Sequence, residues 1–196
     1  MEYIILGLGN TGEEYEETRH NAGRRAVEHF RETCEFPEWK EGPRGGYLFS
    51  KGAIGKHPVT LVLPELFMNK SGAVIKTLMS GKKKADRLIV AHDDIDLGFG
   101  DFKISFGRSS GGHKGVESIV RALKTKDFAR VRIGIAPVTP GGKVRKPHGE
   151  RKVLSFLLGT FEKKEKRVLT RVMNTTDKIF KTIVEHGRAA AMNAFN

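Results

Sequence analysis

Residues 2–12 read EYIILGLGNTG, an apolar run that leads directly into a glycine-rich turn. The run at 2–6 is typical of a buried strand, and the turn has the G-x-G-x-x-G spacing of a dinucleotide-binding loop. Four glutamates follow between positions 13 and 17, where a bound pyrophosphate would have to lie. Because like charges repel, the stretch predicts a strand-to-loop turn and argues against a nucleotide site.

Beyond this stretch, segments with strand patterns alternate along the chain with segments whose apolar residues recur at helical spacing. The expected strands are 2–6, 46–51 and 58–63 (joined as a hairpin), 87–91, 103–106 and 128–136. The expected helices are 22–35, 68–79, 116–123 and 162–185, with a last turn or two at 188–195, and 137–152 is expected to be a loop. This alternation predicts one α/β domain over 1–196, a three-layer sandwich whose mixed, mostly parallel central sheet is flanked by helices.

The charge of the chain is distributed unevenly. The net charge is +12, yet residues 1–100 hold 14 Lys and Arg against 15 Asp and Glu, while residues 101–196 hold 21 against 8. This asymmetry favours a nucleic acid as partner, although a basic surface that serves only solubility stays an alternative. No apolar stretch approaches the ~20 residues of a membrane span, and the N-terminus lacks the basic start of a signal peptide, so we expect a cytoplasmic protein.

Polar clusters follow the expected strands. Asn10 comes after the first strand, His92-Asp93-Asp94 comes after 87–91, and Ser109-Ser-Gly-Gly-His-Lys-Gly115 precedes a helix. Because active sites of open α/β sheets collect at the carboxyl ends of strands, we expect these clusters to meet there. A metal hydrolase could use His92, Asp93, Asp94 and His113, but their spacing matches no preformed metal site, so we expect no metal.

Five strings, in order along nearly the whole chain, resemble the bacterial type of peptidyl-tRNA hydrolase. They are GLGNTGEEYEETRHNAG (7–23), FMNKSG (67–72), HDDID (92–96), SSGGHKG (109–115) and RVRIGIAP (130–137), and the terminal AMNAFN is also similar to that family. The resemblance implies a monomeric esterase, without metal or cofactor, that releases peptides from peptidyl-tRNA.

The resemblance also assigns roles to individual residues. His20 is the expected general base, since a neutral histidine can take a proton from water, and Asp94 is expected to accept from its other ring nitrogen. Asn10 and Asn69 are expected to position the ribose, the peptide carbonyl or its oxyanion. Taken singly, each of these residues also fits a plainer role as a helix cap or turn former. Further substrate contacts are expected from Tyr15, Met68, His113 and Lys114.

The chain departs from the family pattern at three positions. Thr11 stands where the family has proline in GLGNPG, which costs some loop rigidity. Lys114 stands where the family has an asparagine, so we expect an active enzyme with altered peptide handling. In the pair of cations that grips a tRNA phosphate, Arg132 matches one, but Ser105 occupies the place of the other. The tRNA contacts that we expect are therefore Lys103, Arg108 and Arg132.

One further alternative is a protein that binds RNA without catalysis, similar to relatives on this fold that assist intron splicing. Lys114 and Ser105 favour this alternative, because both depart from the family pattern at expected substrate contacts. The four expected catalytic residues are all present, which favours the enzyme.

Overall fold

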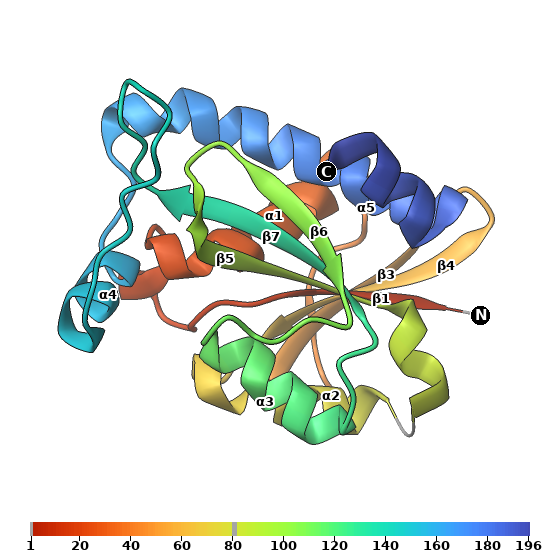
Figure 1. Ribbon diagram of the computed structural model, residues 1–196. Helices are drawn as coiled ribbons and strands as arrows, with labels where there is room; N and C mark the ends of the chain where they lie inside the picture. Colours follow the sequence, from red (N-terminus) through yellow and green to blue (C-terminus); the bar gives the residue numbers. More distant parts are fainter. Residues whose placement is uncertain (1, 80–81) are drawn as a thin grey trace.

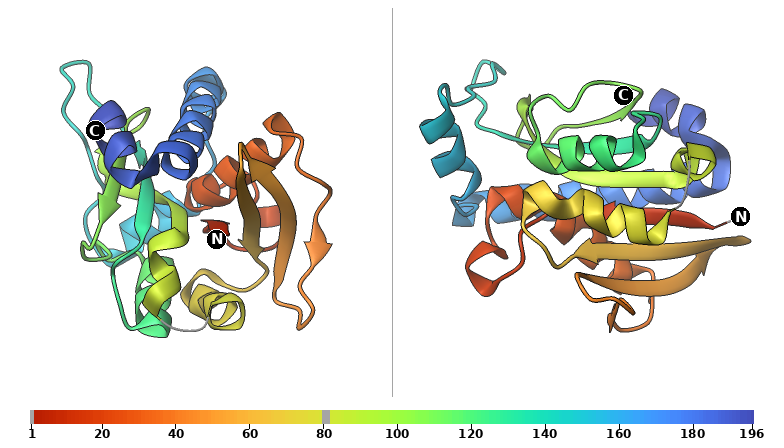
Figure 2. Two further views of the ribbon diagram at one scale, coloured as in Figure 1. Left: turned by 90° about the vertical axis from the view of Figure 1, so that its right-hand side faces the viewer. Right: turned by 90° about the horizontal axis from the view of Figure 1, so that it is seen from below.

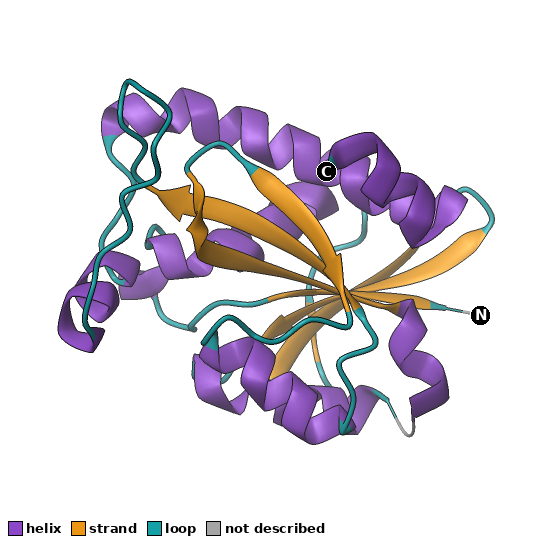
Figure 3. Ribbon diagram, in the orientation of Figure 1, coloured by secondary structure: helices purple, strands orange, loops and turns teal. Residues whose placement is uncertain are grey.

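The computed structural model describes residues 2–79 and 82–196. Its strands are β1 (Tyr3–Gly7), β2 (Lys40–Glu41), β3 (Tyr47–Ile54), β4 (His57–Pro64), β5 (Leu88–Gly98), β6 (Phe102–Phe106) and β7 (Ala129–Ala136). They form one sheet in the order β2-β3-β4-β1-β5-β7-β6. The central strands β4, β1, β5 and β7 pair in parallel, whereas β2 and β3 on one side and β6 on the other pair antiparallel (Figure 3).

Helices cover both faces of the sheet (Figures 1 and 2). They are α1 (Ala22–Thr33), α2 (Ser71–Leu78), α3 (Lys114–Leu123), α4 (Glu150–Leu157) and α5 (Lys166–Phe195). Helices α1 and α5 pack on one face, α2 and α3 pack on the other, and α4 lies beyond the end of the sheet. The expected three-layer α/β architecture is confirmed. Within the described residues, no helix has the length and apolar character to cross a membrane.

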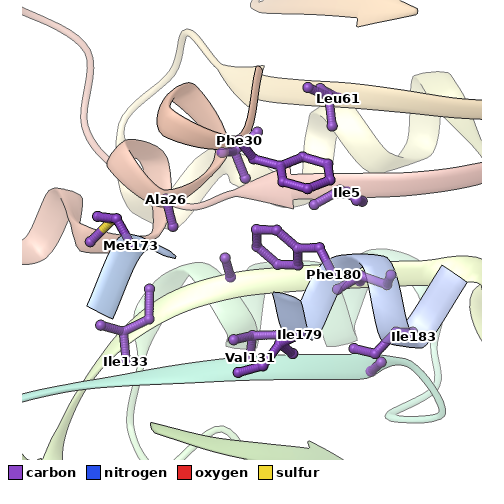
Figure 4. Packing of buried hydrophobic residues seen from close by; sticks show 14 of the residues in the cluster. Ile5, Ala26, Phe30, Leu61, Val131, Ile133, Met173, Ile179, Phe180 and Ile183 are labelled. Carbon is purple, nitrogen blue, oxygen red and sulfur yellow. The ribbon is translucent and has the colours of Figure 1, made fainter. Parts of the chain in front are cut away.

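The larger core lies between the sheet and the pair α1 and α5 (Figure 4). Phe30 of α1 and Phe180 of α5 meet edge to face, with ring centroids 5.2 Å apart, and both are fully buried. Ile5 of β1 and Val131 of β7 belong to the same cluster. Because burying one such side chain stabilises the fold by about 1.5–3 kcal/mol, this cluster holds α1 firmly against the strands.

A glycine of β1 and a glycine of α1 let this helix approach the strands very closely. A side chain at Gly23, in the first turn of α1, would overlap the carbonyl of Ala91 in β5, and one at Gly7 would overlap the carbonyl of Gly23. The Arg24 amide also donates to the Leu8 carbonyl at 2.9 Å. The glycine-rich turn therefore seats a helix on the sheet and brings the residues just before that helix to the carboxyl end of β1.

Two expected boundaries are wrong. Strand β5 does not end at residue 91 but continues to Gly98, because its residues pair with β7 through His92, Asp93 and Asp94. The end of the expected loop at 137–152 belongs to α4, which begins at Glu150. By contrast, the expected helix at 162–185 corresponds to α5 from Lys166 up to a kink at Gly187, whose φ is 84°, and the expected last turn at 188–195 is its continuation to Phe195.

Candidate active site

Two histidines and an aspartate form a compact cluster at the carboxyl end of the sheet. His20 lies in the turn before α1, Asp93 lies in β5, and His113 is the N-cap of α3. The His20 Nδ1 atom lies 2.9 Å from Oδ1 and 3.0 Å from Oδ2 of Asp93. The His113 Nε2 atom lies 3.0 Å from the same Oδ1. Two imidazole rings therefore share one carboxylate that is only 2% exposed.

The carboxylate beside His20 is Asp93, so the expectation that Asp94 accepts from this ring is wrong. Successive side chains of a strand point to opposite faces of the sheet. Asp93 has the parity of Ala91, which faces α1, the helix that follows His20. The Asp94 carboxylate instead accepts from Arg132 Nε at 2.7 Å. Strand parity, applied to a longer β5, could have identified Asp93 from the sequence.

The cluster shifts the acidity of both partners. Burial alone would raise the pKa of Asp93, but the two histidines outweigh it and hold this pKa well below its ordinary value. Burial also acts to lower the pKa of His20, yet the charge and the hydrogen bond of Asp93 outweigh it and raise this pKa above 6.5. With Nδ1–H donating to the carboxylate, the Nε2 atom of neutral His20 is an acceptor.

A cavity of about 450 Å³ opens beside this cluster. Its polar wall contains His20, Asp93, Asp94, His113 and Lys114, and its apolar wall consists of Ile95, Val153, Leu154 and Leu157. The Lys114 side chain is 70% exposed and lies 3.7 Å from Glu117, so its charge is largely solvated at the mouth of the cavity. A polar site beside an apolar wall suits a substrate with a reactive carbonyl and an apolar neighbour.

Asn10 is held rigidly next to the His20 turn. Its amide N–H donates to Asn21 Oδ1 at 2.8 Å, and its carbonyl accepts from Asn21 Nδ2 at 2.9 Å. Its side-chain Oδ1 accepts from the Met68 amide at 3.0 Å. Within the described residues Asn10 Nδ2 has no hydrogen-bond partner, so this donor is available to a ligand.

The other expected substrate contacts are not brought to the cavity. The Met68 side chain is 5% exposed and belongs to the core beneath α2 and α3, so its backbone orients Asn10 while its side chain packs inside. Asn69 is exposed in the following turn, and Tyr15 is half-buried in the turn Glu13–Tyr15. Neither side chain lines the cavity in this structure.

The expected tRNA contacts do come together. Lys103, Arg108 and Arg132 line a second cavity, of about 420 Å³, with Arg130 and Ser105 between them. Arg132 Nη1 lies 3.4 Å from Ser105 Oγ. Burial, followed by repulsion from the neighbouring Arg132, lowers the pKa of Arg130, and the Asp94 carboxylate acts in the opposite direction. A phosphate group would relieve this repulsion.

The cluster around Asp93 also resembles a metal site, since ligand atoms of His20, Asp93 and His113 lie within 4.8 Å of one another. The hydrogen bonds disfavour a metal. His113 Nδ1 accepts from the Val116 amide at 3.3 Å, so its proton is on Nε2, where the metal would have to bind. If that proton moved to Nδ1, two N–H groups, those of His113 and Val116, would point at each other and repel. The arrangement fits a histidine–carboxylate pair better than a metal centre.

Comparisons with known proteins agree with the geometry. A model of the family described as peptidyl-tRNA hydrolase matches residues 4–196. The peptidyl-tRNA hydrolase of Fervidobacterium nodosum is 36% identical over 193 residues, which cover 98% of this chain and 95% of that protein. The one from Clostridium tetani is 34% identical over 195 residues, covering 99% and 97%.

The fold agrees with solved structures as well. The crystal structure of peptidyl-tRNA hydrolase from Acinetobacter baumannii matches with a TM-score of 0.84 and 30% identity, covering 99% of this chain and 94% of that one. The crystal structure of a complex of peptidyl-tRNA hydrolase with N-propanol matches with a TM-score of 0.85 and 31% identity over the same shares. The chain is thus a member of the peptidyl-tRNA hydrolase family.

Proposed function

We propose that the protein hydrolyses the ester bond that links a peptide, or an N-blocked amino acid, to tRNA. The observation that carries this proposal is the buried His20–Asp93 pair, which opens on a cavity with an apolar wall. A histidine oriented by a carboxylate is a general base for water, and membership of the family supports an ester of tRNA as the substrate.

In the proposed reaction His20 Nε2 takes a proton from a water molecule as its oxygen attacks the ester carbonyl. Asp93 stabilises the imidazolium that forms, since its carboxylate accepts from His20 Nδ1. Collapse of the tetrahedral intermediate breaks the bond to the ribose oxygen, which receives the proton back from His20. The products are the peptide carboxylic acid, which ionises, and the free tRNA. Such base catalysis contributes about 10²–10⁴ in rate.

Asn10 is proposed to stabilise the oxyanion through its Nδ2 donor, because its Oδ1 is already bonded to the Met68 amide. Asn69 follows Met68 directly and is exposed, so we propose that it contacts the terminal ribose when the tRNA end is bound. Tyr15 is proposed to meet the terminal adenosine from the rim of the site.

The cationic cavity is proposed to bind a phosphate of the tRNA acceptor stem through Lys103, Arg108 and Arg132. Binding of tRNA then weakens as counterions compete, so raising salt from about 50 to 200 mM lowers the affinity several-fold or more. The proposed enzyme works as a monomer on peptidyl-tRNA and needs no cofactor.

The test is deacylation of an N-acetylated aminoacyl-tRNA by the wild type, His20→Ala and the control His186→Ala, whose exposed histidine lies far along α5. We expect turnover by the wild type and the control, and loss of turnover in His20→Ala. Tight tRNA binding without turnover by the wild type would favour the RNA-binding alternative. Turnover lost only after treatment with a chelator would favour a metal hydrolase.

A further inference from the structure

His113 has both ring nitrogens engaged inside the protein. Nε2 lies 3.0 Å from Asp93 Oδ1, and Nδ1 accepts from the Val116 amide at 3.3 Å as the N-cap of α3. The side chain is only 8% exposed. Little of the ring is therefore available to a substrate, although it lies at the edge of the catalytic cavity.

The N-cap hydrogen bond fixes the tautomer of His113, and so determines that the ring donates to Asp93. An N–H of the helix backbone points at Nδ1, so the ring must carry its proton on Nε2 and donate it to the carboxylate. Asp93 Oδ1 thus receives two donors, one from His20 and one from His113. The start of α3 is in this way connected to the catalytic carboxylate through a single ring.

We propose that His113 is a positioning residue that acts through Asp93. By donating to this carboxylate, it limits how strongly Asp93 draws a proton onto His20, and so lowers the fraction of His20 that is protonated. The proposal rests on the proposed function, in which His20 must be unprotonated to activate water.

The physical basis is competition for one negative charge. A hydrogen bond to the charged form of a carboxylate stabilises that charge, and every added donor leaves less of it to stabilise a neighbouring imidazolium. The groups that face His20 are Asp93 from β5 and His113 from α3, while Asp94, Lys114 and Glu150 lie around the same cavity. Among the residues that the structure describes, His20 and His113 are the two side chains that donate to the Asp93 carboxylate.

His92 contacts both Asp93 and His113. Its Nδ1–H donates to the Asp93 carbonyl at 2.7 Å, and its ring meets that of His113 edge to face with centroids 4.7 Å apart. Burial, followed by the neighbouring His113, holds the pKa of His92 well below its ordinary value. The ring behind His113 therefore stays neutral and adds no second cation to the cluster.

Two substitutions separate the two bonds of His113. His113→Asn keeps an N-cap acceptor for Val116 but is too short to donate to Asp93, and His113→Ser does the same with a hydroxyl. His113→Gln can place a donor near Asp93 but lacks a good cap. For each variant, the titration of His20 is followed by NMR, and kcat/KM for an N-acetylated aminoacyl-tRNA is measured across pH.

We expect His113→Asn and His113→Ser to raise the pKa of His20, which moves the acid limb of kcat/KM to higher pH. At pH 6 their kcat/KM falls roughly three- to tenfold, and the loss disappears on the alkaline side. His113→Gln keeps the wild-type limb but melts a few degrees lower, because α3 has lost its cap.

A His20 titration that is unmoved or shifted to lower pH in both cap-preserving variants would overturn the proposal. A raised KM at every pH with the limb unchanged would also overturn it, since His113 would then contact the substrate. The NMR titration needs no substrate, so it decides the role of His113 even if the wild type fails to hydrolyse peptidyl-tRNA.

Discussion

Two consecutive aspartates of β5, Asp93 and Asp94, lie in different surroundings. Asp93 is 2% exposed and lies between two histidines, whereas the Asp94 side chain is 11% exposed and pairs with Arg132 at 2.7 Å. The pleat of the strand sends them to different faces of the sheet. The Asp93 carboxylate is therefore the partner of His20, the proposed general base, whereas the Asp94 carboxylate is held by Arg132.

The two regions nevertheless share a border. Asp94, Ser110 and Gly111 line both the catalytic cavity and the cationic cavity. Asp94 accepts through Oδ2 from Arg132 Nε and through Oδ1 from the Asp96 amide at 2.8 Å, while Arg132 Nη1 lies 3.4 Å from Ser105 Oγ. Adjacent but chemically distinct sites allow one region to be altered while the other is kept intact.

The largest effect is expected from Asp93→Asn, which removes the charge that orients His20 and stabilises its imidazolium. We expect kcat to fall roughly 10²–10⁴-fold. The matched control is Asp94→Asn, which should leave kcat within a few-fold and act mainly on KM, because the Asp94 carboxylate bonds Arg132 and the Asp96 amide rather than His20. Single-turnover deacylation measures both. Equal losses of kcat in the two variants would contradict the separation of the two regions.

The second-largest effect is expected from Arg132→Gln, which removes a positive charge from the cationic cavity. We expect tRNA affinity to fall about tenfold or more and the slope of log K against log salt to decrease by about one. Arg121→Gln, at the exposed last turn of α3, serves as the control. Filter binding over a salt series provides the measurement. An unchanged slope would show that Arg132 does not contact a tRNA phosphate.

A smaller effect is expected from Lys114→Asn, which removes a solvated charge from the mouth of the catalytic cavity. Because an exposed charge contributes only about 0–1 kcal/mol, we expect KM for an N-acetylated aspartyl- or glutamyl-tRNA to rise up to about fivefold. KM for an uncharged residue such as leucine should stay unchanged. An identical change for acidic and neutral substrates would show that Lys114 does not contact the aminoacyl side chain.

The smallest effect on catalysis is expected from Thr11→Val, which lies outside both regions. Thr11 Oγ1 donates to Glu65 Oε2 at 2.7 Å, and Glu65 also pairs with Arg24 at 2.7 Å. Losing this hydrogen bond should cost about 0.5–1.5 kcal/mol in the free energy of unfolding, with kcat within twofold of the wild type. Urea denaturation measures the first quantity. A large loss of kcat would mean that this bond, and not the backbone, positions Asn10.

The sequence alone predicts the sheet and its helices well where local patterns are strong. The apolar runs of β1 and β7 and the spaced apolar residues of α1 and α3 all form the expected elements. Helix α4 is missed because a Pro-, Gly- and Arg-rich composition precedes it and none of its residues is buried. Its Val153, Leu154 and Leu157 are recognisable only once they line the cavity.

The candidate site is predicted less completely than the fold. His20 and the cations near Ser105 each line a cavity, but Asp94 and Asp93 cannot be distinguished without knowing how far β5 extends. The side chain of Met68 lies in the core because tertiary packing, which no local motif records, decides its burial. The Thr11–Glu65 bond joins residues 54 positions apart, so it too is visible only in the folded chain.

We infer that His20 and Asp93 act as one catalytic unit. A double-mutant cycle on kcat, with His20→Ala, Asp93→Asn and the two combined, tests it most directly. We predict that the double variant is no slower than His20→Ala alone, while His20→Ala and Asp94→Asn combine multiplicatively. If the kcat losses of His20→Ala and Asp93→Asn multiply in full, the two side chains act independently and do not form one unit.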